Sequence, residues 1–419
     1  MRKSWDKPRV MTTTVVLVLL FVTAVWGSDA PRKPKVRAIT AFVKIDRSEY
    51  SRQFQQALTM LRGAKAQFEK GGYAVETLRI TTQPFPEYTR GMSKADALKL
   101  FKDLDDLAVK ESFLLNIGPA MQGDGDDPAQ AELLGGILAT TRINGNLAVA
   151  GEDGIHWNAV RAAARVIKYL ENNSANGAHN FGFAATAMVP PNVPFFPASY
   201  HTGNGHQFSV GLEGGSFVED VFAGAHGDLK IASEDLARDL GQHARALESI
   251  ALHVEKDSGW SYMGLDATPA PNGDSSIAAA MEKLSGSKFG SSGTLTVAAI
   301  ITAAVRSIPV KRVGYSGLML PPLEDPVLAQ RWDEGAYNLD SLLAYSAVCG
   351  TGLDAVALPG DVSLQQLERI IGDVASLAVK WHKPLTARLI PAPGKTAGQR
   401  TDFSFGFGDF PNVVLKPLL

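Results

Sequence analysis

The chain has 419 residues, 45% of them hydrophobic and 20% charged, a composition that is typical of a folded globular protein and excludes a disordered or fibrous one. Its 41 Lys and Arg residues and 43 Asp and Glu residues give a formal net charge of −2, so it lacks the concentrated basic excess of a nucleic-acid-binding protein. The only cysteine, Cys349, excludes an intramolecular disulfide bond.

Residues 1–27 have the three-part order of a secretory signal. A basic head is followed by an uncharged run over Val10–Trp26, and Val25 and Gly27 occupy the −3 and −1 positions of a cleavage site. We expect a signal peptide cleaved after Gly27 or an uncleaved N-terminal membrane anchor. Either one predicts an exported or inner-membrane-anchored protein that faces the periplasm or the extracellular side and touches the membrane only through this segment.

After a predicted linker at residues 28–35, apolar strand-like segments alternate with segments of helical periodicity over 36–419. The ten predicted strands are Val36–Val43, Tyr73–Ile80, Phe113–Ile117, Leu147–Ala150, Phe181–Met188, Gln207–Leu212, Trp260–Ala267, Arg312–Leu320, Leu353–Ala357 and Leu385–Leu389. Predicted helices between them include Tyr50–Lys70, one from the Ser93 cap to Glu111, Asp127–Thr141, His156–Glu171 and Ile231–Lys256. Strands separated by helices indicate parallel crossovers. We therefore expect a single α/β-barrel domain with ten strands, two more than a TIM barrel.

Segments rich in Gly, Pro and polar residues follow several of these strands, where α/β barrels carry their functional loops. Seven blocks in and around them resemble the signature blocks of an uncharacterised bacterial and archaeal family of unknown function: Asn180–Phe183, Pro194–His201, Val210–Glu213, Asp274–Ile277, Gly314–Pro321, Tyr345–Asp354 and Leu358–Asp361. The resemblance covers about residues 36–419. It implies a ten-stranded α/β barrel like that of pyruvate formate-lyase and its glycyl-radical relatives, and it implies no established activity.

Glycyl-radical enzymes combine a barrel cysteine with a glycine in an Arg-Val-x-Gly-Tyr motif near the C-terminus. In this chain Arg312-Val313-Gly314-Tyr315 lacks the intervening residue and lies far from Leu419. An exported protein would also meet oxygen and lack its activating partner. We therefore expect chemistry without a glycyl radical.

Three residues form the predicted catalytic set. Cys349 lies on a glycine-flanked turn whose backbone N–H groups would lower its pKa, which favours a nucleophile or acid–base group; the alternative is a small buried hydrophobic residue. Glu213 follows an apolar strand and precedes Gly214-Gly215, where a helix cap is a poor explanation, so we interpret it as a base. Asp354 is interpreted as a positioning carboxylate in the same block as Cys349.

Four further residues are predicted substrate contacts. Arg388, near the end of the last strand, suits a carboxylate or phosphate clamp, or alternatively an ion pair that locks the barrel seam. His201 is a candidate contact in a loop whose histidine spacing matches no known zinc pattern. Asp266 and Asp361 lie in or beside strand-end blocks, and Asp361 alternatively caps a helix.

These positions favour an enzyme that acts on a small polar or anionic metabolite in the barrel mouth. A non-catalytic small-molecule-binding protein of the cell envelope is the alternative, and an oligomeric structural barrel with a packed interior is the third hypothesis. Paired carboxylates leave a divalent metal cofactor open, and the sequence also leaves a homo-oligomer open.

Overall fold

The computed structural model describes residues 31–273, 275–404 and 410–418. The predicted signal peptide or anchor at residues 1–27 lies outside this part of the chain. Among the described residues, no helix combines the length and apolar character needed to cross a membrane.

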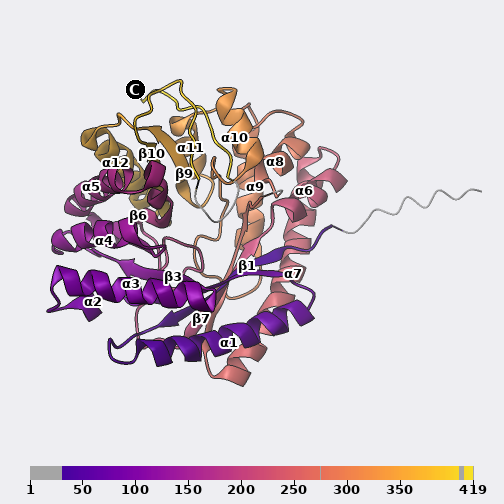
Figure 1. Ribbon diagram of the computed structural model, residues 1–419. Helices are drawn as coiled ribbons and strands as arrows, with labels where there is room; N and C mark the ends of the chain where they lie inside the picture. The colour runs from indigo at the N-terminus through magenta and orange to yellow at the C-terminus, as the bar shows by residue number, and fades with distance from the viewer. Residues whose placement is uncertain (1–30, 274, 405–409, 419) are drawn as a thin grey trace, which may run out of the picture. The chain divides into compact units, whose positions relative to one another are not determined.

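Strands and helices alternate along the chain (Figure 1). The strands are β1 (Lys35–Val43), β2 (Val75–Thr82), β3 (Leu114–Pro119), β4 (Asn144–Gly151), β5 (Gly154–Ile155), β6 (Phe183–Ala187), β7 (Gln207–Glu213), β8 (Ser261–Ala270), β9 (Gly352–Pro359) and β10 (Leu385–Ala392). The helices are α1 (Tyr50–Lys70), α2 (Pro86–Thr89), α3 (Lys94–Glu111), α4 (Ala129–Thr140), α5 (Trp157–Asn173), η1 (Ala175–Gly182), α6 (Gly215–Gly224), α7 (Leu229–Ser258), α8 (Ile277–Ser285), α9 (Thr294–Ser307), α10 (Pro326–Asp333), α11 (Leu339–Ser346) and α12 (Leu364–Trp381).

The described strands form one large, mostly parallel sheet in the order β8-β7-β1-β2-β3-β4-β6-β10-β9, with β5 paired to β4. The parallel set β1, β2, β3, β4 and β6 is flanked by two parallel pairs, β7 with β8 and β9 with β10. Antiparallel contacts of β1 with β7 and of β6 with β10 join these sets. The carboxyl ends of β7 and β10 therefore lie beside the amino ends of β1 and β6.

Nine of the ten predicted strands are present, and the prediction of a strand at Arg312–Leu320 is wrong. Only Arg312 forms a bridge, with Leu265 of β8. Gly314 and Ser316 have φ values of +75° and +45°, a left-handed conformation that interrupts an extended strand. The segment nevertheless bonds to both neighbours, because Val313 N donates to Leu265 O at 3.2 Å and Gly350 N donates to Leu318 O at 3.2 Å. The short strand β5 was not predicted.

The helices form because their apolar residues recur on one face. In α1 the predicted face, Phe54, Leu58, Leu61 and Phe68, is fully buried, and it joins the main core with Ile39 and Ala41 of β1. Side chains alternate along a strand, so Thr40 of β1 lies on the other sheet face.

The loop that follows β6, residues 188–206, packs on that other face. Its backbone is held by side chains from four successive strands. Thr40 Oγ1 donates to Pro194 O at 2.8 Å, and Asn116 Nδ2 and Asn146 Nδ2 donate to Pro197 O at 2.7 and 2.8 Å. Thr81 Oγ1 lies 2.8 Å from Ser199 Oγ. Loop residues also form a second apolar cluster with residues that follow β7: Val189, Val193, Phe195, Ala198, Ala270, Tyr315 and Met319.

Asp325 connects two helices through one fully buried carboxylate. It caps α10 by accepting from Val327 N and Leu328 N, both at 3.0 Å. It also accepts from the Ser276 hydroxyl at 2.6 Å and from Ile277 N at 2.8 Å at the start of α8.

We predict that Asp325→Ala lowers the free energy of unfolding by about 3–5 kcal/mol, because several buried donors lose their acceptor. The matched control is Asp228→Ala, since Asp228 caps α7 through two backbone N–H groups but is exposed; its loss is expected to be about 1 kcal/mol. Urea unfolding measures both values. Equal losses would contradict a special role for the buried cap.

Candidate functional site

The seven predicted site residues do not form one cluster. Glu213 is the last residue of β7, and Arg388 lies in the antiparallel neighbour of β6, so both approach the amino ends of the strands from β1 to β6. Cys349 precedes β9, which runs in the same direction as β7, and therefore lies toward the opposite end of the sheet. The charged side chains described next lie at the end of the sheet where the strands from β1 to β6 begin.

Glu213 forms a buried carboxyl pair with Glu76, the second residue of β2. Lys35, the register partner of Glu213 in β1, places Nζ 3.1 Å from Glu213 Oε1 and 3.3 Å from Glu76 Oε1. On the other side, Arg37 Nη1 lies 2.9 Å from Glu76 Oε2, to which Asn272 Nδ2 donates at 3.2 Å. The side chain of Glu213 is 3% exposed and that of Glu76 is 18% exposed. One carboxyl is thus shielded and its partner reaches solvent.

The environment separates the pKa values of this pair, which we call the glutamate pair. Burial and the adjacent charge of Glu76 raise the pKa of Glu213 to about 7. Burial alone would raise the pKa of Glu76, but hydrogen bonds with Glu213 and Arg37 outweigh it and lower the pKa to about 2. Glu213 Oε2 is buried and has no hydrogen-bond partner within the described chain, an environment that favours the neutral carboxylic acid over the carboxylate. The pair is a carboxylic acid beside a carboxylate.

Asp354 and Arg388 do come together, as an ion pair. Arg388 Nη1 lies 2.6 Å from Asp354 Oδ1 and 3.0 Å from Glu324 Oε1. Its Nη2 donates to Phe181 O at 3.1 Å, and the guanidinium lies over the Phe181 ring, 4.5 Å from the centroid. Burial raises the pKa of Asp354. With two carboxylates already bound, Arg388 matches the seam-locking alternative more closely than an open anion clamp.

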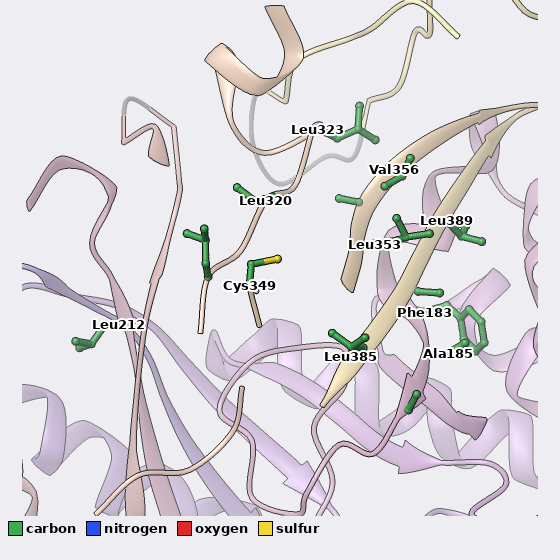
Figure 2. Packing of buried hydrophobic residues seen from close by; sticks show 14 of the residues in the cluster. Phe183, Ala185, Leu212, Leu320, Leu323, Cys349, Leu353, Val356, Leu385 and Leu389 are labelled. Atoms are coloured by element: carbon green, nitrogen blue, oxygen red, sulfur yellow. The ribbon is translucent and has the colours of Figure 1, made fainter. Parts of the chain in front are cut away.

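Cys349 belongs to the main hydrophobic core, where it is 1% exposed. Figure 2 shows it with Leu320, Leu353 and other apolar members of that core. Burial raises the pKa of the thiol, although the charge of Lys383 opposes this shift. Lys383 Nζ is itself occupied, because it donates to the carbonyl oxygens of Ser346, at 2.7 Å, and Cys349. This environment disfavours the thiolate that a nucleophile requires.

The three remaining predicted contacts are dispersed. Asp266 is fully buried and accepts from Thr268 Oγ1 at 2.6 Å and from Tyr315 N at 2.7 Å, so it holds the loop that follows Arg312. His201 Nε2 lies 2.9 Å from Val43 O, and burial lowers its pKa. Asp361 is exposed, and it does not cap α12.

The cap of α12 is Ser363, whose hydroxyl accepts from Gln366 N at 3.2 Å. Among the described residues there is also no group of three or more His, Cys, Asp and Glu side chains placed to hold a metal ion.

Two hollows of about 640 and 630 Å³ are present on the described surface. The first, between α1 and α3, is lined in part by Glu76, Thr77 and Leu78 at the start of β2. None of the seven predicted residues lines either hollow. Glu76 is therefore the residue through which the glutamate pair meets an open surface.

Sequence reasoning missed Glu76, Lys35, Arg37 and Arg79. Glu76 and Arg79 are charged residues inside an otherwise strand-like run, Tyr73–Ile80. A charge within a predicted buried strand is a usable signal, because such groups are rarely buried without a partner. Lys35 and Arg37 carried no comparable signal, since charges at the start of a strand are common at a surface.

We predict that the glutamate pair makes stability depend on pH in a way that Glu213→Gln removes. Between about pH 4.5, the ordinary pKa, and pH 7, the folded protein retains a proton that the unfolded chain releases. The free energy of unfolding therefore falls as the pH rises through this window, by roughly 1–3 kcal/mol from this group. Urea unfolding at pH 4.5 and 7 measures the fall in both proteins.

Glu132→Gln is the control, because Glu132 is exposed. This variant should show the same decrease in the free energy of unfolding between pH 4.5 and 7 as the parent protein. Other buried acids, such as Asp266 with a pKa raised to about 6, titrate in the same window, so the difference between variant and parent is the quantity that counts. An identical fall in Glu213→Gln would show that the pair does not hold this proton.

Comparison with known proteins gives one distant structural similarity and a set of sequence relatives. In structure, the anaerobic ribonucleotide reductase from Thermotoga maritima, solved in complex with dATP and CTP, aligns with a TM-score of 0.41 and 8% identity over 86% of this chain and 75% of that chain. A UPF0210 protein of Pyrobaculum aerophilum is 32% identical over 354 residues, which cover 80% of this chain and 78% of the relative.

A UPF0210 protein of Desulforudis audaxviator is 30% identical over 359 residues, 81% of this chain and 79% of the relative. The family model described as "Uncharacterised ACR (DUF711)" matches residues 30–404. This confirms the resemblance to an uncharacterised bacterial and archaeal family, and the chain belongs to the DUF711 family.

Proposed function

We propose that this protein is an enzyme that acts on a small polar or anionic metabolite at the sheet end where β1 and β2 begin and β7 ends. The observation that carries the proposal is the glutamate pair, a shielded carboxyl and a more exposed carboxylate held together by Lys35 and Arg37. Structural ion pairs match opposite charges, whereas two facing carboxyl groups are costly unless they share a proton. Sharing a proton suits the pair to acid–base work.

In this proposal Glu213 gives a proton to the substrate or takes one from it, and Glu76 is the carboxylate that raises the pKa of Glu213. A group whose pKa lies near neutral pH combines a useful population of either protonation state with a sufficient driving force for transfer, and Glu213 meets this condition with a pKa of about 7. Glu76 and Arg37, each 18% exposed, and Lys35, 50% exposed, lie where a substrate can approach. Arg37 and Lys35 then hold the pair in place and attract anions.

We also propose that the sheet closes into a ten-stranded barrel of the pyruvate formate-lyase type. Residues 311–323 supply the support, since they bond to β8 at Leu265 and, through Leu323 N to Ala355 O at 3.3 Å, to β9. The proposed chemistry uses no glycyl radical, because Cys349 is embedded in the apolar core and the Arg312–Tyr315 segment lacks one residue of the radical motif.

A non-catalytic small-molecule-binding protein is the second candidate. It is favoured because two residues that were predicted to contact substrate already have protein partners: Asp266 accepts four hydrogen bonds and Arg388 binds two carboxylates. Such a protein would be stabilised by its ligand without converting it.

We predict that Glu213→Gln lowers turnover by a factor of about 10²–10⁴, the usual contribution of one acid–base group, because the amide keeps the shape and loses the exchangeable acid proton. Turnover is measured by mass spectrometry on pools of small polar and anionic metabolites. Glu171→Gln is the matched control, since Glu171 is also 3% exposed and pairs with a lysine, Lys168, at 2.5 Å. That variant should keep full turnover.

Two results would contradict this assignment. If Glu213→Gln keeps full turnover while Cys349→Ala loses it, the thiol is the catalytic group. If ligands stabilise the parent protein and none is converted, the protein is the binding protein of the second candidate.

We further propose export, from the order of residues in the N-terminal segment. Expression of the full chain in a bacterial host should place it outside the cytoplasm, with N-terminal sequencing showing cleavage after Gly27 or, for an anchor, an intact N-terminus in the membrane fraction. Recovery of an intact chain from the cytoplasm would contradict both forms of the proposal.

A further inference from the structure

Arg79 is a buried arginine without an anionic partner. It lies in the middle of β2 and is 6% exposed, and no carboxylate of the described residues comes within 4.0 Å of its guanidinium. Its acceptors among the described residues are neutral: Nε donates to Thr77 Oγ1 at 3.0 Å and Nη1 to Pro194 O at 3.5 Å. The guanidinium also lies over the Phe196 ring, 5.0 Å from the centroid.

The acids around Arg79 are already committed to other cations. Glu76 binds Arg37 and Lys35, while Glu324 and Asp354 bind Arg388. Arg79 therefore belongs to neither ion-pair cluster, although the charges of both contribute to its environment. Burial, followed by the charge of Arg37, lowers its pKa to about 9, and the charges of Glu324 and Glu76 oppose the shift, so the group remains a cation at neutral pH. A buried cation that lacks a counter-charge is unfavourable and requires compensation.

The unused N–H groups of Arg79 remain available. A guanidinium carries five N–H donors, and two of those of Arg79 have acceptors in the described chain. Arg388 Nε is sealed from solvent without a partner, whereas no nitrogen of Arg79 is sealed in this way. Thr77 is fixed as well, because its hydroxyl donates to Arg37 O at 2.6 Å. The Nε side of Arg79 is thus held by the protein, and the Nη2 side is left for a ligand.

We propose that Arg79 is the receptor for an oxyanion group, carboxylate or phosphate, on the substrate. The oxyanion binds the free edge of the guanidinium, supplies the missing counter-charge and is bounded by the Phe196 ring. Arg79 and Glu76 belong to the same strand, β2, and the charge of Glu76 contributes to the electrostatic environment of Arg79. The assignment of that anchored molecule as a substrate rests on the proposed function, whereas the anion site itself does not.

The experiment is thermal unfolding of the full chain in increasing inorganic phosphate or sodium acetate, with sodium chloride matching the ionic strength throughout. We expect at least one of the two anions to raise the Tm of the parent protein along a saturating curve, and the arm that responds distinguishes phosphate from carboxylate. Arg79→Met should weaken the apparent affinity at least tenfold. Its Tm without the anion should equal or exceed that of the parent, because an unpaired buried charge is replaced by an apolar side chain of similar length.

Arg331→Met is the matched control. Arg331 is also buried, but it is paired with Glu282 at 2.6 Å. Its loss should lower the Tm in chloride and leave the response to the anion unchanged. Arg79→Lys is the second variant if Arg79→Met fails to fold, since it keeps the charge and loses the planar fork, and it should weaken anion binding at least fivefold.

A parent protein that responds to neither anion overturns the proposal, as does an Arg79 variant that responds like the parent. An Arg79-dependent response in a protein without turnover supports the anion site and removes the proposed enzymatic function. Turnover that depends on Glu213 but not on Arg79 supports the proposed function and overturns the assignment of the bound anion as part of the substrate. The two proposals can therefore fail separately.

Discussion

The antiparallel contact between β1 and β7 is the constraint on which the charged site depends. A chain of parallel crossovers alone would place every strand start at one end of the sheet and every strand end at the other. Because β7 runs against β1, its final residue, Glu213, meets the first residue of β1, Lys35. The contact of β10 with β6 repeats the arrangement and brings Arg388 to the carbonyl of Phe181. Residues from strand starts and strand ends thus share one site.

Charge matching explains much of what this site contains. Burial of so many ionisable groups is tolerated because nearly all are paired, with Arg37 on Glu76 and Arg388 on Asp354 and Glu324. Asp266, Asp325 and Lys383 are buried without an ionic partner but are held by hydrogen bonds to neutral groups. The facing carboxyls of Glu76 and Glu213 and the cation Arg79 depart further from simple pairing. Departures from local consistency in a folded protein tend to coincide with functional positions, and strand β2 contributes Glu76 to one of them and Arg79 to the other.

Sequence patterns predicted the α/β class, nine strands and most helices, because hydrophobic periodicity reports which face of an element is buried. They failed at Arg312–Leu320, whose apolar composition resembles a strand although Gly314 and Ser316 take left-handed conformations. For the site, Asp354 and Arg388 were both selected, but their mutual pairing depends on the register of β9 against β10. Glu76 was missed because its partner, Glu213, is distant in sequence and meets it only through the sheet order. The spacing of residues along the sequence does not show which side chains on distant strands will meet in the sheet.

The loop at residues 188–206 is tied to the sheet through Thr40, Thr81, Asn116 and Asn146, one residue from each of β1, β2, β3 and β4. These anchors are separated by more than a hundred residues from end to end, and their spacing matches the loop only when all four strands are in register. The loop can therefore dock only on a sheet whose four strands are already paired in register. Its docking must follow strand pairing during folding, because non-local contacts of this kind form only after the intervening chain has closed. A shift of register in any one of these strands would release the loop and disrupt the apolar cluster that the loop forms with Ala270, Tyr315 and Met319.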